Sequence, residues 1–300
     1  MATGKPKAGS AEHRELFCRS FIDSHLQFEP ERLAWPELDP VMLQRLREVP
    51  FWQEVLYTEM RAIRIIEAFA PTIPDPLVRE AMELMAEEER RHERLVRHLI
   101  ARYGIVIEAR DIPPLPSDIE RTFIDFGYGE CVDSFLGFGF FRLARESGFL
   151  PPEMFDVLEI LMGEEVRHVL FFVNWMAWHQ ARRGRGAAAW RGPASAWYYA
   201  RAVAALVGVA LRNARQQGNG REFSATQAAG LMPGFTVGGL LEACLEENRR
   251  RLDGYGRDLL RPLFLPALAR FALRLTGRRI PEDMREEGNL MRRVWTVLRG

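Results

Sequence analysis

Two short motifs along the chain each carry a glutamate and a histidine three residues apart. Glu89 and His92 form the first pair, and Glu165 and His168 form the second. Residues three apart on an α-helix lie on the same face, so both side chains of a pair can reach one ion. Carboxylate oxygens and imidazole nitrogens are ligands for divalent transition metals. The two motifs therefore indicate a metal site built from two helices.

Two further glutamates interrupt apolar stripes in the segments that precede these motifs. Glu59 lies in the stripe at 52–69, and Glu130 lies in the stripe at 123–141. A carboxylate in a core-facing stripe is costly to bury without a partner. Counting from the intervening turns places Glu59 level with Glu89, and Glu130 level with Glu165, to within about one helical turn. The four carboxylates and two imidazoles are thus expected to converge in one dry core.

The expected donor set is hard and rich in oxygen. Such a set suits Fe or Mn better than a structural Zn. The four glutamates would balance two divalent cations, whereas four buried carboxylates without metal would repel one another strongly. The sequence therefore predicts two Fe ions, with Mn as the alternative metal. A structural bundle with buried Glu–His or Glu–Arg pairs and no metal is the competing interpretation.

The charged residues beside the motifs are interpreted as accessory groups. Asp133, one turn beyond the metal-facing glutamate of its segment, is a candidate for a hydrogen bond to a ligand imidazole. An exposed aspartate is the equal alternative at that position. Glu88 and Arg91 are expected to be solvated, and Glu164 is expected to pair with Arg167 outside the metal-facing stripe.

The segments that must position these residues read as helices. Apolar residues recur at three- and four-residue steps, and no convincing alternating strand pattern occurs, so the predicted fold class is all-α. Proline and glycine clusters mark the breaks between helices. The expected helices span residues 12–26, 39–48, 51–70, 75–103, 119–147, 152–182, 194–217, 236–253, 256–276 and 281–298.

One long connection determines the expected topology. Residues 104–118 are rich in proline and would reach about 50 Å when extended, at about 3.3 Å per residue. This length can span a bundle, so residues 50–182 are expected to form a four-helix bundle with one long crossover. Residues 1–49 would form an N-terminal helical extension, and residues 183–300 a C-terminal helical extension packed on the bundle.

With these motifs, residues 50–182 resemble the ferritin-like di-iron carboxylate superfamily. That superfamily uses one glutamate on each of two helices and Glu-x-x-His on each of the other two. The resemblance implies two sets of iron ligands: Glu59, Glu89 and His92 for one iron, and Glu130, Glu165 and His168 for the other. It also implies that Glu89 and Glu165 are the candidates for ligands that bridge both irons.

The resemblance implies several functions, among which the sequence discriminates in part. Residues 183–300 disfavour a storage cage of bare bundles, and three scattered cysteines, Cys18, Cys131 and Cys244, cannot supply a rubredoxin module. No tyrosine is well placed for radical generation. An O2-dependent oxygenase or oxidase acting on a small or hydrophobic organic substrate is therefore expected, with electrons from an external reductase. A ferroxidase or iron-handling protein and a non-catalytic helical binding module are the alternatives.

Small residues gather beside the proposed metal, and they support the oxygenase interpretation. They are Gly127, Gly129, Ser134, Gly137 and Gly139. Such residues lower helix stability and would leave space for O2 and a substrate. Close packing of helices is the alternative for each glycine.

Composition limits the remaining function classes. The 300 residues include 41 Lys+Arg and 41 Asp+Glu, and this neutrality argues against a nucleic-acid partner. No signal peptide is visible and no cysteine framework occurs, so a cytoplasmic location is expected. The longest apolar run, 202–211, is too short to span a bilayer, while the helix at 194–217 is a minor candidate for surface association. A homodimer is an open alternative to a monomer.

Overall fold

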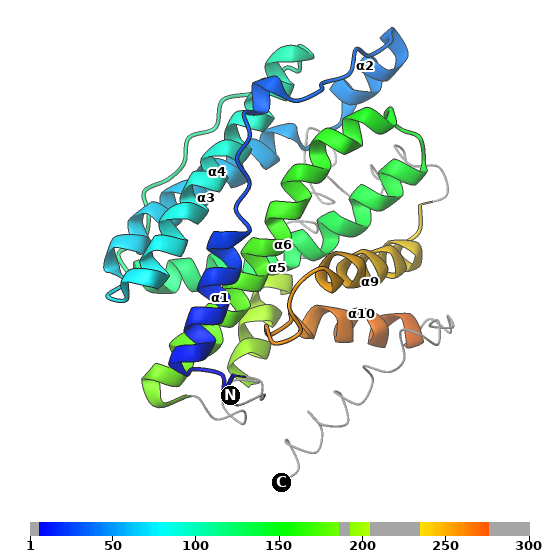
Figure 1. Ribbon diagram of the computed structural model, residues 1–300. Coiled ribbons are helices and arrows are strands. Elements are labelled where there is room, and N and C mark those ends of the chain that lie inside the picture. Colours follow the sequence, from blue (N-terminus) through cyan, green and yellow to red (C-terminus); the bar gives the residue numbers. More distant parts are fainter. Residues whose placement is uncertain (1–5, 186–192, 205–234, 276–300) are drawn as a thin grey trace.

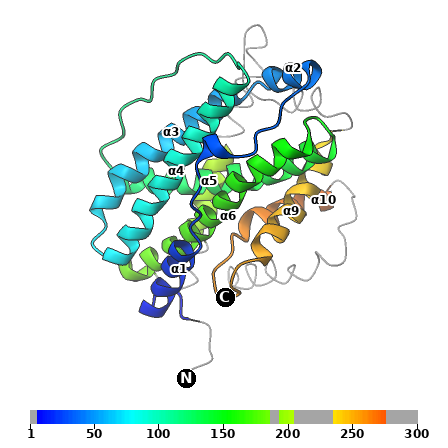
Figure 2. The ribbon, with the colours of Figure 1, turned by 45° about the horizontal axis from the view of Figure 1, so that its top comes forward.

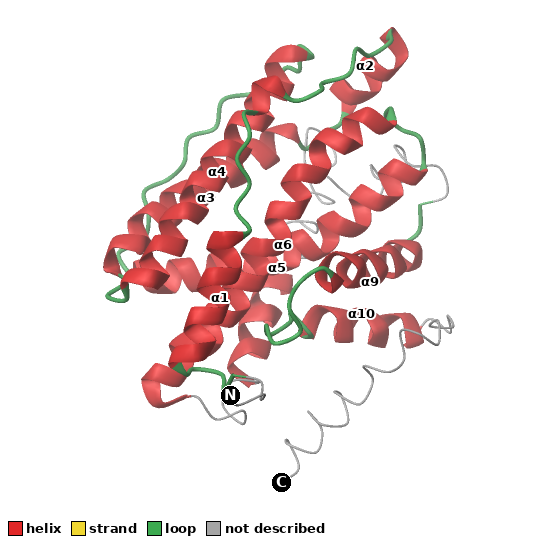
Figure 3. Ribbon diagram, viewed as in Figure 1, coloured by secondary structure: helices red, strands yellow, loops and turns green. Residues whose placement is uncertain are grey.

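The computed structural model describes residues 6–185, 193–204 and 235–275, and the regular structure in these ranges is helical (Figure 3). The all-α fold class predicted from the sequence is confirmed. The helices are α1 (Ala11–Asp23), α2 (Pro40–Glu48), α3 (Trp52–Phe69), α4 (Pro76–Arg102), α5 (Ile119–Glu146), α6 (Pro152–Gln180), α9 (Val237–Asp253) and α10 (Phe264–Leu275), with short helical turns at Pro30–Arg32, Ala70–Thr72 and Ala181–Arg185.

Local sequence signals set the two ends of α4. The side chain of Asp75 accepts a hydrogen bond from the backbone N–H of Val78 and so caps the first turn. At the other end, Gly104 has a φ of +59°, a conformation that favours glycine. The N–H of Ile105 then donates to the carbonyl of Ile100, which closes the helix in a Schellman-type arrangement. These two ends define a helix of 27 residues, which carries both apolar core residues and the Glu89–His92 motif.

The helices α3 and α4 form one hairpin, and α5 and α6 form another (Figure 1). The connection between the two hairpins runs along the outside of α3 (Figure 2). Arg64 on α3 donates to the carbonyl of Ile112 at 3.1 Å, and Arg110 forms an ion pair with Glu54. The connection between α4 and α5 is therefore the long crossover that the sequence predicted.

Additional helices cover the bundle on two sides (Figure 1). The N-terminal helix α1 packs against α4 and α6, while α9 packs along α5 and α10 packs on α9. Polar contacts near its start help to fix α1: His13 Nε2 lies 3.0 Å from Asn174 Oδ1, and Arg14 Nη1 lies 2.8 Å from Asp75 Oδ2. The side of the bundle between α4 and α6 is therefore covered by the N-terminal helix.

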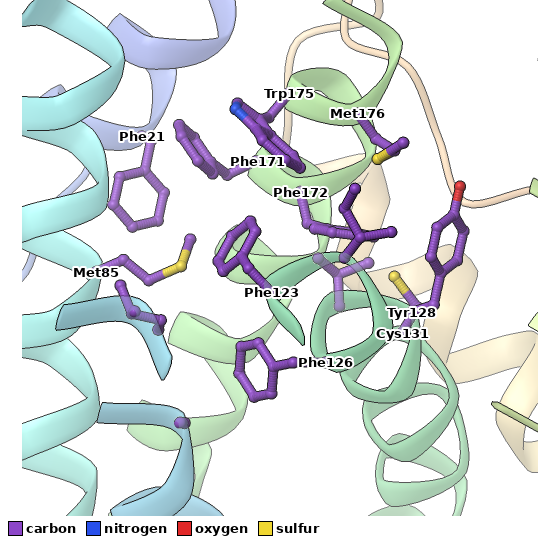
Figure 4. Packing of buried hydrophobic residues seen from close by; sticks show 14 of the residues in the cluster. Phe21, Met85, Phe123, Phe126, Tyr128, Cys131, Phe171, Phe172, Trp175 and Met176 are labelled. Atoms are coloured by element: carbon purple, nitrogen blue, oxygen red, sulfur yellow. The ribbon is translucent and has the colours of Figure 1, made fainter. Parts of the chain in front are cut away.

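Two hydrophobic clusters divide the interior of the bundle along its length. The larger cluster includes Phe21, Ile66, Phe69, Met82, Met85, Phe123, Phe126, Phe171, Phe172 and Trp175, several of which are drawn in Figure 4. The smaller cluster includes Trp52, Leu95, Leu99, Met154, Phe155 and Leu161. In the sequences of α3, α4 and α6 the predicted ligands fall between residues of the two clusters, whereas Glu130 on α5 lies among residues of the larger cluster. A polar level with apolar side chains on both sides is a low-dielectric setting for charged groups.

The structure corrects one predicted helix, and two others lie partly or wholly outside the described residues. Residues 256–263 are not helical, and α10 begins at Phe264, because the backbone N–H and carbonyl of Leu260 bond to the side chain of Asn174 instead. Residues 193–204 are helical as predicted, whereas 205–217 and 281–298 lie outside the described residues. None of the helices in the described ranges combines the length and apolar character needed to cross a bilayer.

Candidate metal centre

Four of the six predicted ligands meet between α4 and α6. One donor atom from each of Glu89, His92, Glu165 and His168 lies within 4.8 Å of the other three. Nδ1 of His92 lies 3.2 Å from Oε1 of Glu165, and Nδ1 of His168 lies 3.1 Å from Oε1 of Glu89. Among these carboxylates, each Nδ1 is thus closest to the one that comes from the opposite motif.

Glu89 and Glu165 lie between the two imidazoles. The second oxygen of Glu89 is 3.7 Å from Nδ1 of His92, and the second oxygen of Glu165 is 3.8 Å from Nδ1 of His168. Each carboxylate therefore directs one oxygen toward each imidazole. A carboxylate shared by two neighbouring cations needs this arrangement, and these are the two residues that the resemblance to the di-iron superfamily implies as bridging candidates.

The remaining two predicted ligands come from α3 and α5. Oε2 of Glu59 lies 3.6 Å from Nδ1 of His92, and burial raises the pKa of Glu59 to about 8. Glu130 is half-buried, and burial together with the charges of Glu165 and Glu89 raises its pKa well above the usual value. All six predicted ligands thus belong to one electrostatically coupled group, of which Glu130 is the least enclosed.

Three buried polar atoms of this group have no hydrogen-bond partner: Nδ1 of His92, Nδ1 of His168 and Oε2 of Glu165. Buried polar atoms are normally paired, because removing them from water costs free energy that a hydrogen bond otherwise offsets. The three atoms belong to one set of metal-type donors. A cation bound among them would satisfy all three, so the residues present fit a metal.

The outer nitrogens of both imidazoles are held by two further glutamates. Nε2 of His92 lies 3.0 Å from Oε2 of Glu164, and Nε2 of His168 lies 2.9 Å from Oε2 of Glu88. An ionised carboxylate only accepts hydrogen bonds, so each Nε2 carries a proton and donates it. When a metal is bound, this leaves the Nδ1 lone pair for the metal. Carboxylate support of this kind orients metal-binding histidines in general.

Each supporting glutamate also pairs with an arginine of the opposite motif. Arg91 forms an ion pair with Glu164, and Arg167 Nη1 lies 2.8 Å from Oε1 of Glu88. Both glutamates are 0% exposed. Burial acts to raise the pKa of Glu88, but the hydrogen bond from His168 and the charge of Arg167 outweigh it and lower that pKa to about 2. Glu88 is therefore a permanently ionised acceptor at neutral pH.

Glu88, Glu164, Arg91 and Arg167 form a supporting layer behind the two imidazoles, and this layer is the part of the site that sequence reasoning missed. Glu88 was expected to be solvated, and this prediction is wrong because the side chain is fully enclosed. The expected contact of Arg167 with Glu164 exists at 3.7 Å, yet both groups are buried and belong to the site. The available signal was the repeat itself, because both motifs read Glu-Glu-x-Arg-His and not only Glu-x-x-His.

Asp133 does not occupy the supporting position that the sequence offered it. Its side chain is exposed on α5. Both imidazole Nε2 atoms are instead bonded to Glu88 and Glu164. The alternative of an exposed aspartate is the one that the structure favours.

The imidazoles sit in a field that attracts positive charge. Burial acts to lower the pKa of His92, but the neighbouring carboxylates of Glu164 and Glu165 raise it well above the usual value. The same balance holds for His168, where Glu89 and Glu88 raise the pKa against the effect of burial. The cluster therefore binds protons strongly in the absence of a metal, and the same field favours a divalent cation.

The glycines of α5 serve two different purposes. A Cβ atom on Gly127 would lie 2.1 Å from the ring of Phe172, and one on Gly139 would lie 2.3 Å from Sγ of Cys244. These two positions allow close packing. A Cβ atom on Gly129 or Gly137 would meet nothing within 4 Å. Space beside the site is therefore offered at these two positions and not along the whole run of small residues.

A scan against protein-family models, a search of curated proteins and a search of solved structures found no match to this chain. The described residues provide a helical bundle with a buried cluster of carboxylates and imidazoles that is compatible with two metal ions.

Proposed function

We propose that this chain is a di-iron carboxylate protein of the ferritin-like type, with Mn as the alternative metal. The observation that carries the proposal is the pair of buried, unpartnered Nδ1 atoms of His92 and His168, which face the carboxylates of Glu89 and Glu165. An oxygen-rich set with two imidazoles favours Fe or Mn. The carboxylates behind both imidazoles support the proposal, because they prepare each ring to donate its Nδ1 lone pair.

We further propose that the centre oxidises a small or hydrophobic organic substrate with O2. Bound iron would supply the O2 chemistry, while the chain supplies orientation and an apolar surrounding. His92 and His168 are 0% and 4% exposed, whereas Glu130 is half-buried and Gly129 next to it borders open space. This asymmetry favours access from the α5 side. An external reductase would deliver the electrons.

Metal analysis tests the first proposal. Purified protein loaded with Fe(II) without oxygen should hold about two iron ions per chain, as the donor set of this class implies. Replacing His92 or His168 by alanine should lower this number. The matched control is H98A, because His98 lies on the same helix and its ring centre lies 5.2 Å from that of Trp35, outside the cluster. A parent chain that holds well under one metal would overturn the proposal and favour a non-catalytic binding module.

Oxygen uptake tests the second proposal. With a chemical reductant present, the iron-loaded protein should consume O2 repeatedly and oxidise members of a panel of hydrophobic organic compounds. A ferroxidase would instead consume O2 only in proportion to the Fe(II) added and would accumulate Fe(III). Particle size provides an independent check, because assembly into a large closed shell would favour iron storage.

A further inference from the structure

The end of the N-terminal helix reaches the layer that supports His168. Nη2 of Arg167 donates to the carbonyl of Phe21 at 2.7 Å, and Nε of Arg167 donates to Oγ of Ser24 at 2.9 Å. Nδ1 of His25 lies 2.6 Å from Oε1 of Glu88. Three groups in and just after the last turn of α1 therefore contact Glu88, which bonds to the outer nitrogen of His168, and Arg167, which pairs with Glu88.

The aromatic ring of Phe21 adds a further contact to the same place. The guanidinium carbon of Arg167 lies 4.6 Å from the centre of this ring, and the ring centres of Phe21 and His168 are 6.0 Å apart. On the other half of the site, Arg91 lies 4.5 Å from the ring centre of Phe28. The two halves repeat one another in the motifs, but the backbone and hydroxyl contacts from the end of α1 go to the His168 half.

These contacts form a series in which each residue orients the next. Ser24 and the carbonyl of Phe21 orient the guanidinium of Arg167, that guanidinium and His25 orient the carboxylate of Glu88, and the carboxylate orients His168. A carboxylate fixed by donors from α6 and from the segment after α1 has little freedom to turn. We propose that residues 21–25 are a positioning element of the metal centre, so that docking of the N-terminal helix and metal binding strengthen each other.

The same place offers a second interpretation, which its charges argue against. His25, Glu88 and Glu164 bring donor atoms within 4.8 Å of one another and so resemble a further cation site. However, Arg167 is already paired with Glu88, and Arg91 with Glu164. Guanidinium groups thus supply the positive charge at these oxygens, and a metal ion there would be repelled by both arginines. The trio is best understood as the outer support of the metal centre.

The inference rests on the proposed function and can be tested separately from it. If docking of α1 strengthens metal binding by some factor, metal binding must strengthen docking by the same factor. Outer support of a metal ligand typically contributes about 10- to 100-fold in affinity. His25 and Ser24 act through Glu88 and Arg167, so we expect H25A and S24A each to weaken the binding of one of two Co(II) equivalents by about tenfold, the lower end of that range.

Two further variants separate positioning from a general effect on folding. H25N keeps an N–H donor close to the place of the imidazole Nδ1 and should bind Co(II) nearly as the parent does. R19A removes an exposed side chain of α1 that pairs only with Glu15 among the ion pairs of the structure's described part, and it should leave Co(II) binding unchanged. Visible absorption of Co(II) during titration measures both equivalents, and circular dichroism verifies that each variant is helical.

Hydrogen exchange supplies the reciprocal measurement. Amides of residues 11–25 in the parent should exchange more slowly after Co(II) loading, and this protection should be reduced in H25A. The inference is overturned if H25A and S24A bind both equivalents as tightly as R19A, or if Co(II) leaves exchange in residues 11–25 unchanged. If the parent itself binds no Co(II), the proposed function fails and the inference fails with it, whereas the first two results leave the proposed function intact.

Discussion

Replacing Glu88 by glutamine would remove one negative charge from the supporting layer with little change in side-chain size. Oε1 of Glu88 receives hydrogen bonds from Arg167 and His25, and Oε2 receives one from His168. All of these partners donate. Glutamine offers one oxygen and one NH2 group, so its NH2 must face a donor. The variant would therefore leave a buried donor unpaired and a buried arginine without its full counter-charge.

The size of the effect follows from the pKa of Glu88. The folded chain lowers that pKa from a usual value of 4.5 to about 2, which corresponds to about 3 kcal/mol in favour of the ionised carboxylate. Because the folded-state pKa is lowered, this stabilisation is complete above about pH 4.5 and is lost as pH falls toward 2. We expect E88Q to reduce the free energy of unfolding by about 3 kcal/mol at pH 7, and by progressively less below about pH 4.5.

Urea unfolding of the metal-free protein measures this difference. The control is E87Q, since Glu87 precedes Glu88 in the same helix and is exposed. A Co(II) titration of the same variants should show affinity about 10- to 100-fold weaker in E88Q than in E87Q. Equal unfolding free energies and equal Co(II) affinities in the two variants would refute the role assigned to the supporting layer.

Three other results are expected. Binding of Co(II) should release protons from His92, His168, Glu59 and Glu130, because carboxylates raise the pKa of both imidazoles against burial, and burial raises the pKa of Glu59 to about 8 and that of Glu130 well above its usual value. Calorimetry at pH 6.5 in two buffers would count these protons, and affinity should rise with pH. Chelation should lower the free energy of unfolding by about 3 kcal/mol for each Co(II) ion removed, relative to protein at a free Co(II) concentration 100 times the Kd of that ion, measured by urea. G127A should lose about 1 to 3 kcal/mol of stability, because its Cβ would meet a ring at 2.1 Å, whereas G129A should gain up to about 1 kcal/mol in the same assay.

The predictable parts of the fold are those that depend on local pattern. Spacing of apolar residues located α3, α4, α5 and α6 to within about two residues, because these helices are long and strongly periodic. The same periodicity placed Glu59, Glu89 and Glu165 on inward faces, since each interrupts an apolar stripe. By contrast, the start of α10 depends on Asn174, which lies in another helix, and no local pattern of residues 256–263 reports that contact.

The supporting layer was harder to predict because it lies on another face of the same helices. Glu88 and Glu164 directly precede the metal-facing glutamates and therefore point about 100° away from them. In a bare four-helix bundle that face would be exposed. Here α1 covers it, and each glutamate reaches the arginine and histidine of the opposite helix. Only the position of α1 and the approach of α4 to α6 turn these carboxylates from surface charges into part of the site.

The charges of the supporting glutamates and arginines, counted together with those of the inward ligands, favour two metal ions. The group contains six carboxylates, from Glu59, Glu88, Glu89, Glu130, Glu164 and Glu165, and two guanidinium groups, from Arg91 and Arg167. With neutral imidazoles, four negative charges stay uncompensated, and two divalent cations cancel them. Without metal, both imidazoles, Glu59 and Glu130 are the groups that take up protons in place of the cations, because the pKa of each is raised. One divalent cation would leave half of this charge to protons, so the two cations are expected to bind as a pair.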